Sequence, residues 1–67
     1  MRLQSHAIEA IAYDENAQIL TARFRDSGET VIYEDVPQEL YDALLFADSV
    51  GSFFNRNIRD CFVSREV

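Results

Sequence analysis

The sequence predicts an α+β domain in which a three-stranded antiparallel sheet is covered on one face by two helices. Three short segments rich in β-branched and aromatic residues open the chain, and polar turn residues bound each of them. A proline follows, and after it apolar residues recur at spacings of three and four, which is typical of a helix. A chain of 67 residues can build only one thin core, so we expect a single domain over residues 1–67.

The three segments are predicted to form a β-meander over about residues 7–14, 18–25 and 29–35. A slip of one residue would move every side chain to the other face of the sheet, so the apolar pattern selects the register. A four-residue loop in the first hairpin pairs Tyr13 with Leu20. A hairpin loop through Gly28 places Phe24 opposite Val31.

This register separates a large apolar face from a smaller, half-polar one. The apolar face, which we expect to form the core, carries Ile11, Tyr13, Leu20, Ala22, Phe24, Val31 and Tyr33. The other face, called the outer face below, carries Ala10, Ala12, Thr21, Arg23, Thr30, Ile32 and Glu34. The outer face is small and flat and only half polar, which makes it a candidate interaction surface.

The two helices are predicted over about residues 37–47 and 50–57. Pro37 suits a first helical position, because its missing N–H would have no partner there. Asp48 or Ser49 can cap the second helix. Beyond that helix, residues 64–67 are predicted to fray.

Charge disfavours generic polyanion binding, and hydropathy argues against a membrane partner. Twelve acidic residues against six arginines give a formal charge of −6, and generic polyanion binding needs positive charge to neutralise phosphates. Arginine forms forked hydrogen bonds to phosphate, so a local patch can still bind RNA; the alternative is that the arginines pair with nearby carboxylates. No apolar run approaches the roughly 20 residues that cross a bilayer, so we expect a cytoplasmic protein with no membrane partner.

The sequence contains no recognisable catalytic or metal-binding constellation. Cys61 is the only cysteine and His6 the only histidine, so there is neither an internal disulfide nor a Cys/His zinc set. Gly28 and Gly51 belong to no phosphate-binding motif. His6 lies in a predicted mobile N-terminal arm, where it makes a poor base for a nucleophile. We therefore expect a protein that is not an enzyme and uses no metal or cofactor.

A set of residues spread over nearly the whole chain follows a particular order: Ser5, Ile8, Tyr13-Asp14, Leu20, Phe24, Gly28, Tyr33, Val36-Pro37, Tyr41, Leu45, Ala47, Ser49, Gly51, Phe54-Asn55 and Ile58. In this order the chain resembles the KTSC domain family, small domains found alone in bacterial and phage proteins and at the C-terminus of some lysyl-tRNA synthetases. The most specific parts are the Val36-Pro37 step followed by Tyr41, and the spacing from Ala47 to Asn55.

The resemblance implies RNA binding as a candidate activity, chiefly because the family is attached to tRNA synthetases; it implies no established biochemical activity. The chain departs from the family's central pair of tyrosines, since Tyr33 matches the second but Val31 stands at the first position. The strand alternation directs both residues toward the core. A tyrosine-to-valine difference there is a packing exchange, which favours a structural role over a recognition role.

Two candidate functions follow. The first is an RNA-binding module that uses Tyr41, Asn55, Arg56 and Arg59. In it the arginines contact phosphates, while an exposed Tyr41 or Phe54 ring stacks on a base. The alternative interpretation of these residues is that Phe54 belongs to the core and that Asn55 bonds backbone carbonyls at the helix end.

The second candidate is a protein-interaction module or homodimer. It uses the outer face, with contacts from Ala10, Ala12, Thr21, Arg23 and Ile32. Exposed edge strands also permit sheet extension by a partner. A third interpretation leaves this face solvated and the protein monomeric. The charge of −6 favours a protein partner, and the family resemblance favours RNA.

Overall fold

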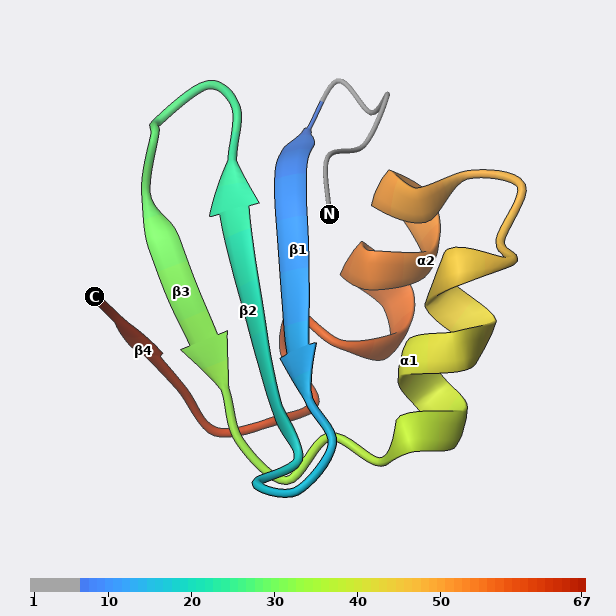
Figure 1. Cartoon of the computed structure of the whole chain (residues 1–67). Helices are drawn as coiled ribbons and strands as arrows, with labels where there is room; N and C mark the ends of the chain where they lie inside the picture. The colour runs from blue at the N-terminus through green and yellow to red at the C-terminus, as the bar shows by residue number, and fades with distance from the viewer. Residues whose placement is uncertain (1–6) are drawn as a thin grey trace.

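The structure, a computed structural model, describes residues 7–67 and shows a four-stranded antiparallel sheet with two helices (Figure 1). The elements are β1 (Ile8–Asp14), β2 (Ile19–Phe24), β3 (Thr30–Tyr33), α1 (Gln38–Leu45), α2 (Val50–Asn57) and β4 (Ser64–Glu66). The strands lie in the order β1-β2-β3-β4. The α+β class, the meander and the two helices are as predicted, and a fourth strand is added. The predicted arm with His6 lies outside the described residues.

The fourth strand corrects the prediction that residues 64–67 fray. β4 pairs antiparallel with β3 and places Ile32 opposite Arg65. Just beyond it, the Val67 N–H donates a hydrogen bond of 2.9 Å to the Thr30 carbonyl. Every residue of β4 is exposed, so backbone hydrogen bonds rather than burial hold this strand in place.

The second hairpin is offset by two residues from its predicted register, whereas the first hairpin pairs as predicted. Val31 lies opposite Ala22 rather than Phe24. Gly28 closes the intervening loop with a φ of +72°, and its N–H donates to the Phe24 carbonyl at 2.9 Å. A shift of two residues preserves the alternation, so the side chains keep their predicted faces.

A β-bulge at the start of β1 turns Ile8 into the core. Ile8 pairs with Phe24 while Ala10 pairs with Arg23, so Glu9 is an extra residue on this strand. Simple alternation would place Ile8 on the outer face beside Ala10. With the bulge, Ile8 is only 1% exposed.

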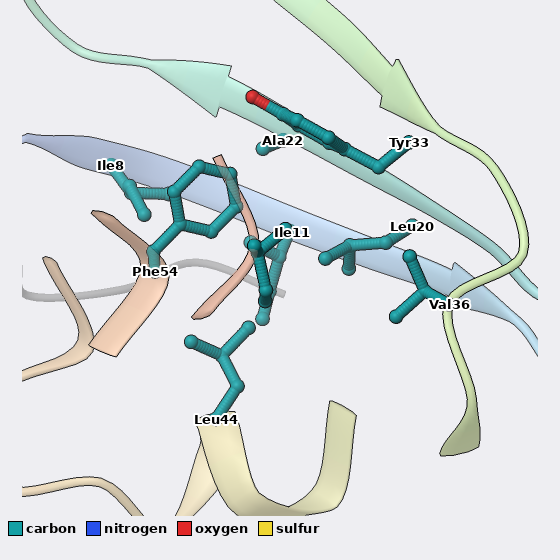
Figure 2. Packing of buried hydrophobic residues seen from close by; sticks show 9 residues of the cluster. Ile8, Ile11, Leu20, Ala22, Tyr33, Val36, Leu44 and Phe54 are labelled. Atoms are coloured by element: carbon teal, nitrogen blue, oxygen red, sulfur yellow. The ribbon is translucent and has the colours of Figure 1, made fainter. Parts of the chain in front are cut away.

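The core is one apolar cluster between the sheet and the helices (Figure 2). Its buried residues are Ile8, Ile11, Leu20, Ala22, Tyr33, Val36, Leu44, Phe54 and Ile58. The other residues predicted for the inner face, Tyr13, Phe24 and Val31, are partly buried and pack against it. The Phe54 ring meets Phe24 and Tyr33 edge to face, at centroid distances of 5.7 and 5.2 Å. These rings attach α2 to the sheet.

The second helix has its predicted bounds, and the first is shorter. Ser49 caps α2, where its Oγ accepts a hydrogen bond of 3.3 Å from the Ser52 N–H. Pro37 has a ψ of 150°, which is extended backbone, so it precedes α1 rather than occupying its first turn. The helix α1 ends at Leu45, and Phe46 caps it: its N–H donates to the Asp42 carbonyl at 3.3 Å, while 87% of its surface is exposed.

The Tyr13 hydroxyl fixes the connection from β3 to α1. It donates a hydrogen bond of 2.6 Å to the Val36 carbonyl, 23 residues along the chain. The Tyr13 ring stacks on Tyr41 of α1, with centroids 4.6 Å apart and planes 13° from parallel. The Val36 N–H in turn donates to the Gln18 carbonyl at 2.9 Å. The first hairpin and the start of α1 are thereby held together.

Replacing Tyr13 by phenylalanine is expected to lower the free energy of unfolding by about 1 kcal/mol at neutral pH, because the ring stays and the hydrogen bond is lost. Burial, followed by the negative charges of Glu39 and Asp42, raises the pKa of Tyr13 above its ordinary value of 10.0. The unfolded chain therefore loses this proton first, and as pH rises above that value the stability contributed by the hydroxyl declines.

Urea unfolding of wild type and Tyr13→Phe at neutral and at strongly alkaline pH measures both effects. The difference in stability between the two proteins should shrink at alkaline pH. Equal stabilities at neutral pH would contradict the proposed contribution of the hydrogen bond.

Candidate binding surfaces

The five residues predicted for protein contact lie together on the outer face. Ala12, Thr21 and Ile32 are successive partners across β1, β2 and β3, and Ala10 with Arg23 forms the next pair. All five are exposed or half-buried. The core and both helices lie on the opposite face, so nothing within residues 7–67 covers this one.

β4 adds apolar area to the outer face. Ile32 is opposite Arg65, so the residues two positions away, Val63 and Val67, share the side of the sheet with Arg65. Their side chains are 69% and 77% exposed. The sequence prediction missed them because this segment was expected to fray; the alternation from Val63 to Val67 was the available signal.

Two ion pairs balance the charges of the outer face. Arg23 Nε lies 3.5 Å from Glu9 Oε2, and Arg65 Nε lies 3.6 Å from Glu34 Oε2. Such solvent-exposed pairs contribute little to stability. The two pairs contribute two positive and two negative groups to the outer face. Their charges therefore cancel there, although the whole chain has a net charge of −6.

The four residues predicted for RNA contact are distributed over several places. Asn55 and Arg59 line the same hollow, described below. Arg56 lines a different hollow of about 320 Å³ near the start of α2. Tyr41 lines neither of these and stacks on Tyr13. The structure therefore brings together only one pair of the four.

The Tyr13 ring that stacks on Tyr41 lies in a negative field. Burial raises the pKa of Tyr13, and the charges of four carboxylates raise it further: Glu39, Asp42, Glu15 and Asp14. A phosphate beside Tyr41 would meet this negative field rather than a counterion.

Phe54 and Asn55 have clear structural assignments. Phe54 is fully buried, so the interpretation as a core residue is confirmed and its ring is not available to stack on a base. The hydrogen bond at the end of α2 that we expected from Asn55 comes from Asn57 instead. The Asn57 Nδ2 donates to the Phe53 carbonyl at 3.1 Å. The exposed Asn55 lines the hollow described next.

A hollow of about 540 Å³ opens between the β2–β3 turn and the C-terminal end of α2, and we name it the hairpin hollow. Its lining includes Phe24, Val31, Tyr33, Asn55, Arg59 and Asp60. Sequence reasoning selected Asn55 and Arg59 but did not place them opposite the hairpin. That placement depends on how α2 lies on the sheet.

Tyr33 of β3 is one of the residues that line this hollow. It is 3% exposed, and Figure 2 shows its hydroxyl at the C-terminal end of β2, where the hollow begins. Burial raises the pKa of Tyr33; the Arg59 guanidinium opposes that rise, and Asp60 adds to it. The hydroxyl makes no hydrogen bond with any described residue, and Arg59 makes no ion pair within residues 7–67.

No metal cluster and no membrane-spanning helix occurs in the described part of the chain. No group of three or more His, Cys, Asp or Glu residues there could hold a metal ion. None of the helices over residues 7–67 combines the length and apolar character that a membrane span requires. Cys61 is exposed.

The fold and its surfaces define a small α+β domain with one antiparallel sheet and two helices on one face. The model of the KTSC domain family matches residues 4–62, and the chain belongs to this family. A KTSC domain protein from Yersinia pestis, known from its crystal structure, has the same fold with a TM-score of 0.95. It is 31% identical, and the alignment covers 100% of this chain and 93% of that one.

Two further relatives are similar over most of their length. A protein of Tsukamurella paurometabola is 45% identical over 60 residues, which are 90% of this chain and 88% of the relative. An uncharacterized protein of Stutzerimonas stutzeri is 46% identical over 54 residues, 81% of this chain and 75% of the relative. These comparisons place the chain in a family of uncharacterized small proteins.

Proposed function

We propose that this domain is a non-enzymatic interaction module whose outer face binds a second copy of the same chain. The observation that supports this most directly is a flat, partly apolar and charge-balanced surface on an acidic protein. Contact between two copies elsewhere would bring like charges together, which opposes association. On the outer face each arginine is matched by a glutamate.

The positions of the charges also suit a pair of copies related by two-fold symmetry. Arg23 is paired with Thr30 at one end of the β2–β3 ladder, and Glu34 follows β3 at the other end. Consider a two-fold axis that lies in the plane of the interface and is perpendicular to the strands. Each strand of one copy then lies over the same strand of the other copy and runs in the opposite direction. Glu34 of the second copy then lies over Thr30, beside Arg23.

The size of the surface indicates a weak complex. The four strands contain 20 residues, and at about 3.4 Å per residue and about 4.8 Å between strands they present roughly 330 Å² of flat area. This is less than half of the roughly 800 Å² that each partner contributes to a standard protein interface. We therefore expect association in the micromolar to millimolar range, dependent on protein concentration.

RNA binding, implied by the family resemblance, has less support from the geometry. Only Asn55 and Arg59 of the candidate contacts share a hollow, and Asp60 lies beside them. The Tyr13 ring that stacks on Tyr41 lies in the negative field of four carboxylates. Fluorescence anisotropy with labelled single-stranded RNA and tRNA at low salt tests this alternative, and salt-sensitive binding there would favour it.

Sedimentation velocity over a wide concentration range tests the self-association. Wild type should shift toward a dimer as concentration rises, and Ile32→Arg should remain monomeric because it places an unpaired charge at the centre of the face. Arg23→Glu and Glu34→Arg should each weaken association by roughly tenfold, and the double charge swap should restore much of it.

Arg56→Glu is the matched control, since it makes the same charge change at an exposed α2 position away from the outer face. It should associate as tightly as wild type, apart from its effect on net charge. A wild-type protein that stays monomeric at every concentration, or an Ile32→Arg variant that associates normally, overturns the proposal.

A further inference from the structure

We infer that the hairpin hollow binds a small zwitterion, an α-amino acid with a large apolar side chain, either free or as part of a dipeptide. The assignment rests on hydrogen-bond donors that no described residue uses, on carboxylates that include Asp60 beside them, and on apolar side chains, all lining one hollow. It is independent of the outer face and of self-association.

The donor end of the hollow suits a carboxylate. The Tyr33 hydroxyl belongs to a residue that is only 3% exposed, and it has no hydrogen-bond partner among the described residues. No buried side-chain nitrogen or oxygen of the described residues lacks a hydrogen-bond partner, so this hydroxyl still reaches the space of the hollow and can donate to an acceptor bound there. The Arg59 guanidinium and the Asn55 amide line the same hollow. Arginine presents paired donors that match the two oxygens of a carboxylate.

The acidic groups of the hollow suit an ammonium group and disfavour polyanions. Asp26, Glu29 and Asp60 line it, and none of them forms an ion pair with a residue in the range 7–67. Among the described residues of the lining, Arg59 is the one cation, against three carboxylates. A phosphate or an RNA backbone would meet this excess of negative charge, whereas a ligand with one anionic and one cationic group has a partner for each of its charges.

The floor and the size of the hollow indicate the side chain of the ligand. The partly buried Phe24 and Val31 supply apolar surface beside the ring of Tyr33. A volume of about 540 Å³ lies within the range of small-molecule sites, roughly 300–1,000 Å³. An aromatic or branched aliphatic side chain can cover this floor while the carboxylate and the ammonium, which share one carbon, meet Arg59 and the adjacent Asp60.

The test is a titration of the ¹⁵N-labelled protein followed by amide chemical shifts, with L-phenylalanine as the probe at millimolar concentrations. Shifts should be saturable and centred on the β2–β3 turn and the end of α2. Phenethylamine, which lacks the carboxylate, and 3-phenylpropanoate, which lacks the ammonium, should each bind at least about tenfold more weakly. Glycyl-L-phenylalanine distinguishes the two sources: tighter binding than phenylalanine identifies a dipeptide, and weaker binding identifies the free amino acid.

Two variants connect any binding to the named groups. Arg59→Gln should weaken L-phenylalanine binding by at least about tenfold, and Tyr33→Phe, which keeps the buried ring, by several fold. Arg56→Gln removes the same charge from a different hollow and should bind like wild type. The inference is overturned if the amide shifts do not saturate, if Arg59→Gln binds normally, or if the two analogues bind as well as phenylalanine.

Discussion

Phe54→Ala is expected to destabilise the domain by about 3–5 kcal/mol, enough to leave it largely unfolded at room temperature. Phe54 is fully buried, and its ring contacts Phe24 and Tyr33 edge to face. A 67-residue domain has a total stability of roughly 3–10 kcal/mol. Removing the ring would leave a cavity between α2 and the sheet that a thin core has few side chains to fill.

Phe46→Ala provides the matched control, because it makes the same substitution at a residue that is 87% exposed. We expect it to change the free energy of unfolding by less than about 0.5 kcal/mol. Circular dichroism during urea unfolding measures both variants. Similar losses from Phe46→Ala and Phe54→Ala would show that burial does not determine the contribution of these rings.

The strands and helices could be predicted because their signals are local. The alternation in the first half of the chain set the faces of the sheet, and Ser49 marked the start of α2. Even the two-residue offset in the second hairpin left Val31 facing inward, as predicted. In the structure Val31 packs against the buried core, which is consistent with its interpretation as a packing exchange.

The fourth strand and the bulge were missed because simple rules gave the wrong local answer. The prediction of fraying rested on chain position, yet residues 64–66 have an unpaired edge of β3 beside them. The spacing of Ile8 and Ile11, three positions apart, breaks strict alternation and was a usable signal for the bulge at Glu9.

Of the two candidate surfaces, one could be predicted from the sequence and the other could not. The outer face could be predicted, because it lies within one sheet and follows from register alone. The hairpin hollow could not, because Tyr33 and Arg59 come from segments whose separation depends on how α2 docks on the sheet. Docking is set by core residues, and the sequence pattern specifies which residues are buried without specifying their relative positions.

Leu44→Ala is expected to lower the free energy of unfolding by about 2–5 kcal/mol. Leu44 is the only fully buried residue of α1, and Figure 2 shows its side chain reaching toward the sheet. An eight-residue helix is too short to be stable in water by itself, so its helicity depends on this contact and on the Tyr13–Tyr41 stack. The substitution should therefore detach α1 as well as create a cavity.

Leu45→Ala separates this effect from the intrinsic preference for helix, because it makes the same change at the next, only half-buried position. Since alanine favours helix slightly more than leucine does, any loss of helicity must come from lost packing. We expect Leu45→Ala to cost about 1 kcal/mol, and native-state hydrogen exchange to show early opening of α1 amides in Leu44→Ala alone. If both variants open equally, α1 is held by its whole apolar stripe; a difference between them shows that one side chain anchors the helix covering this sheet.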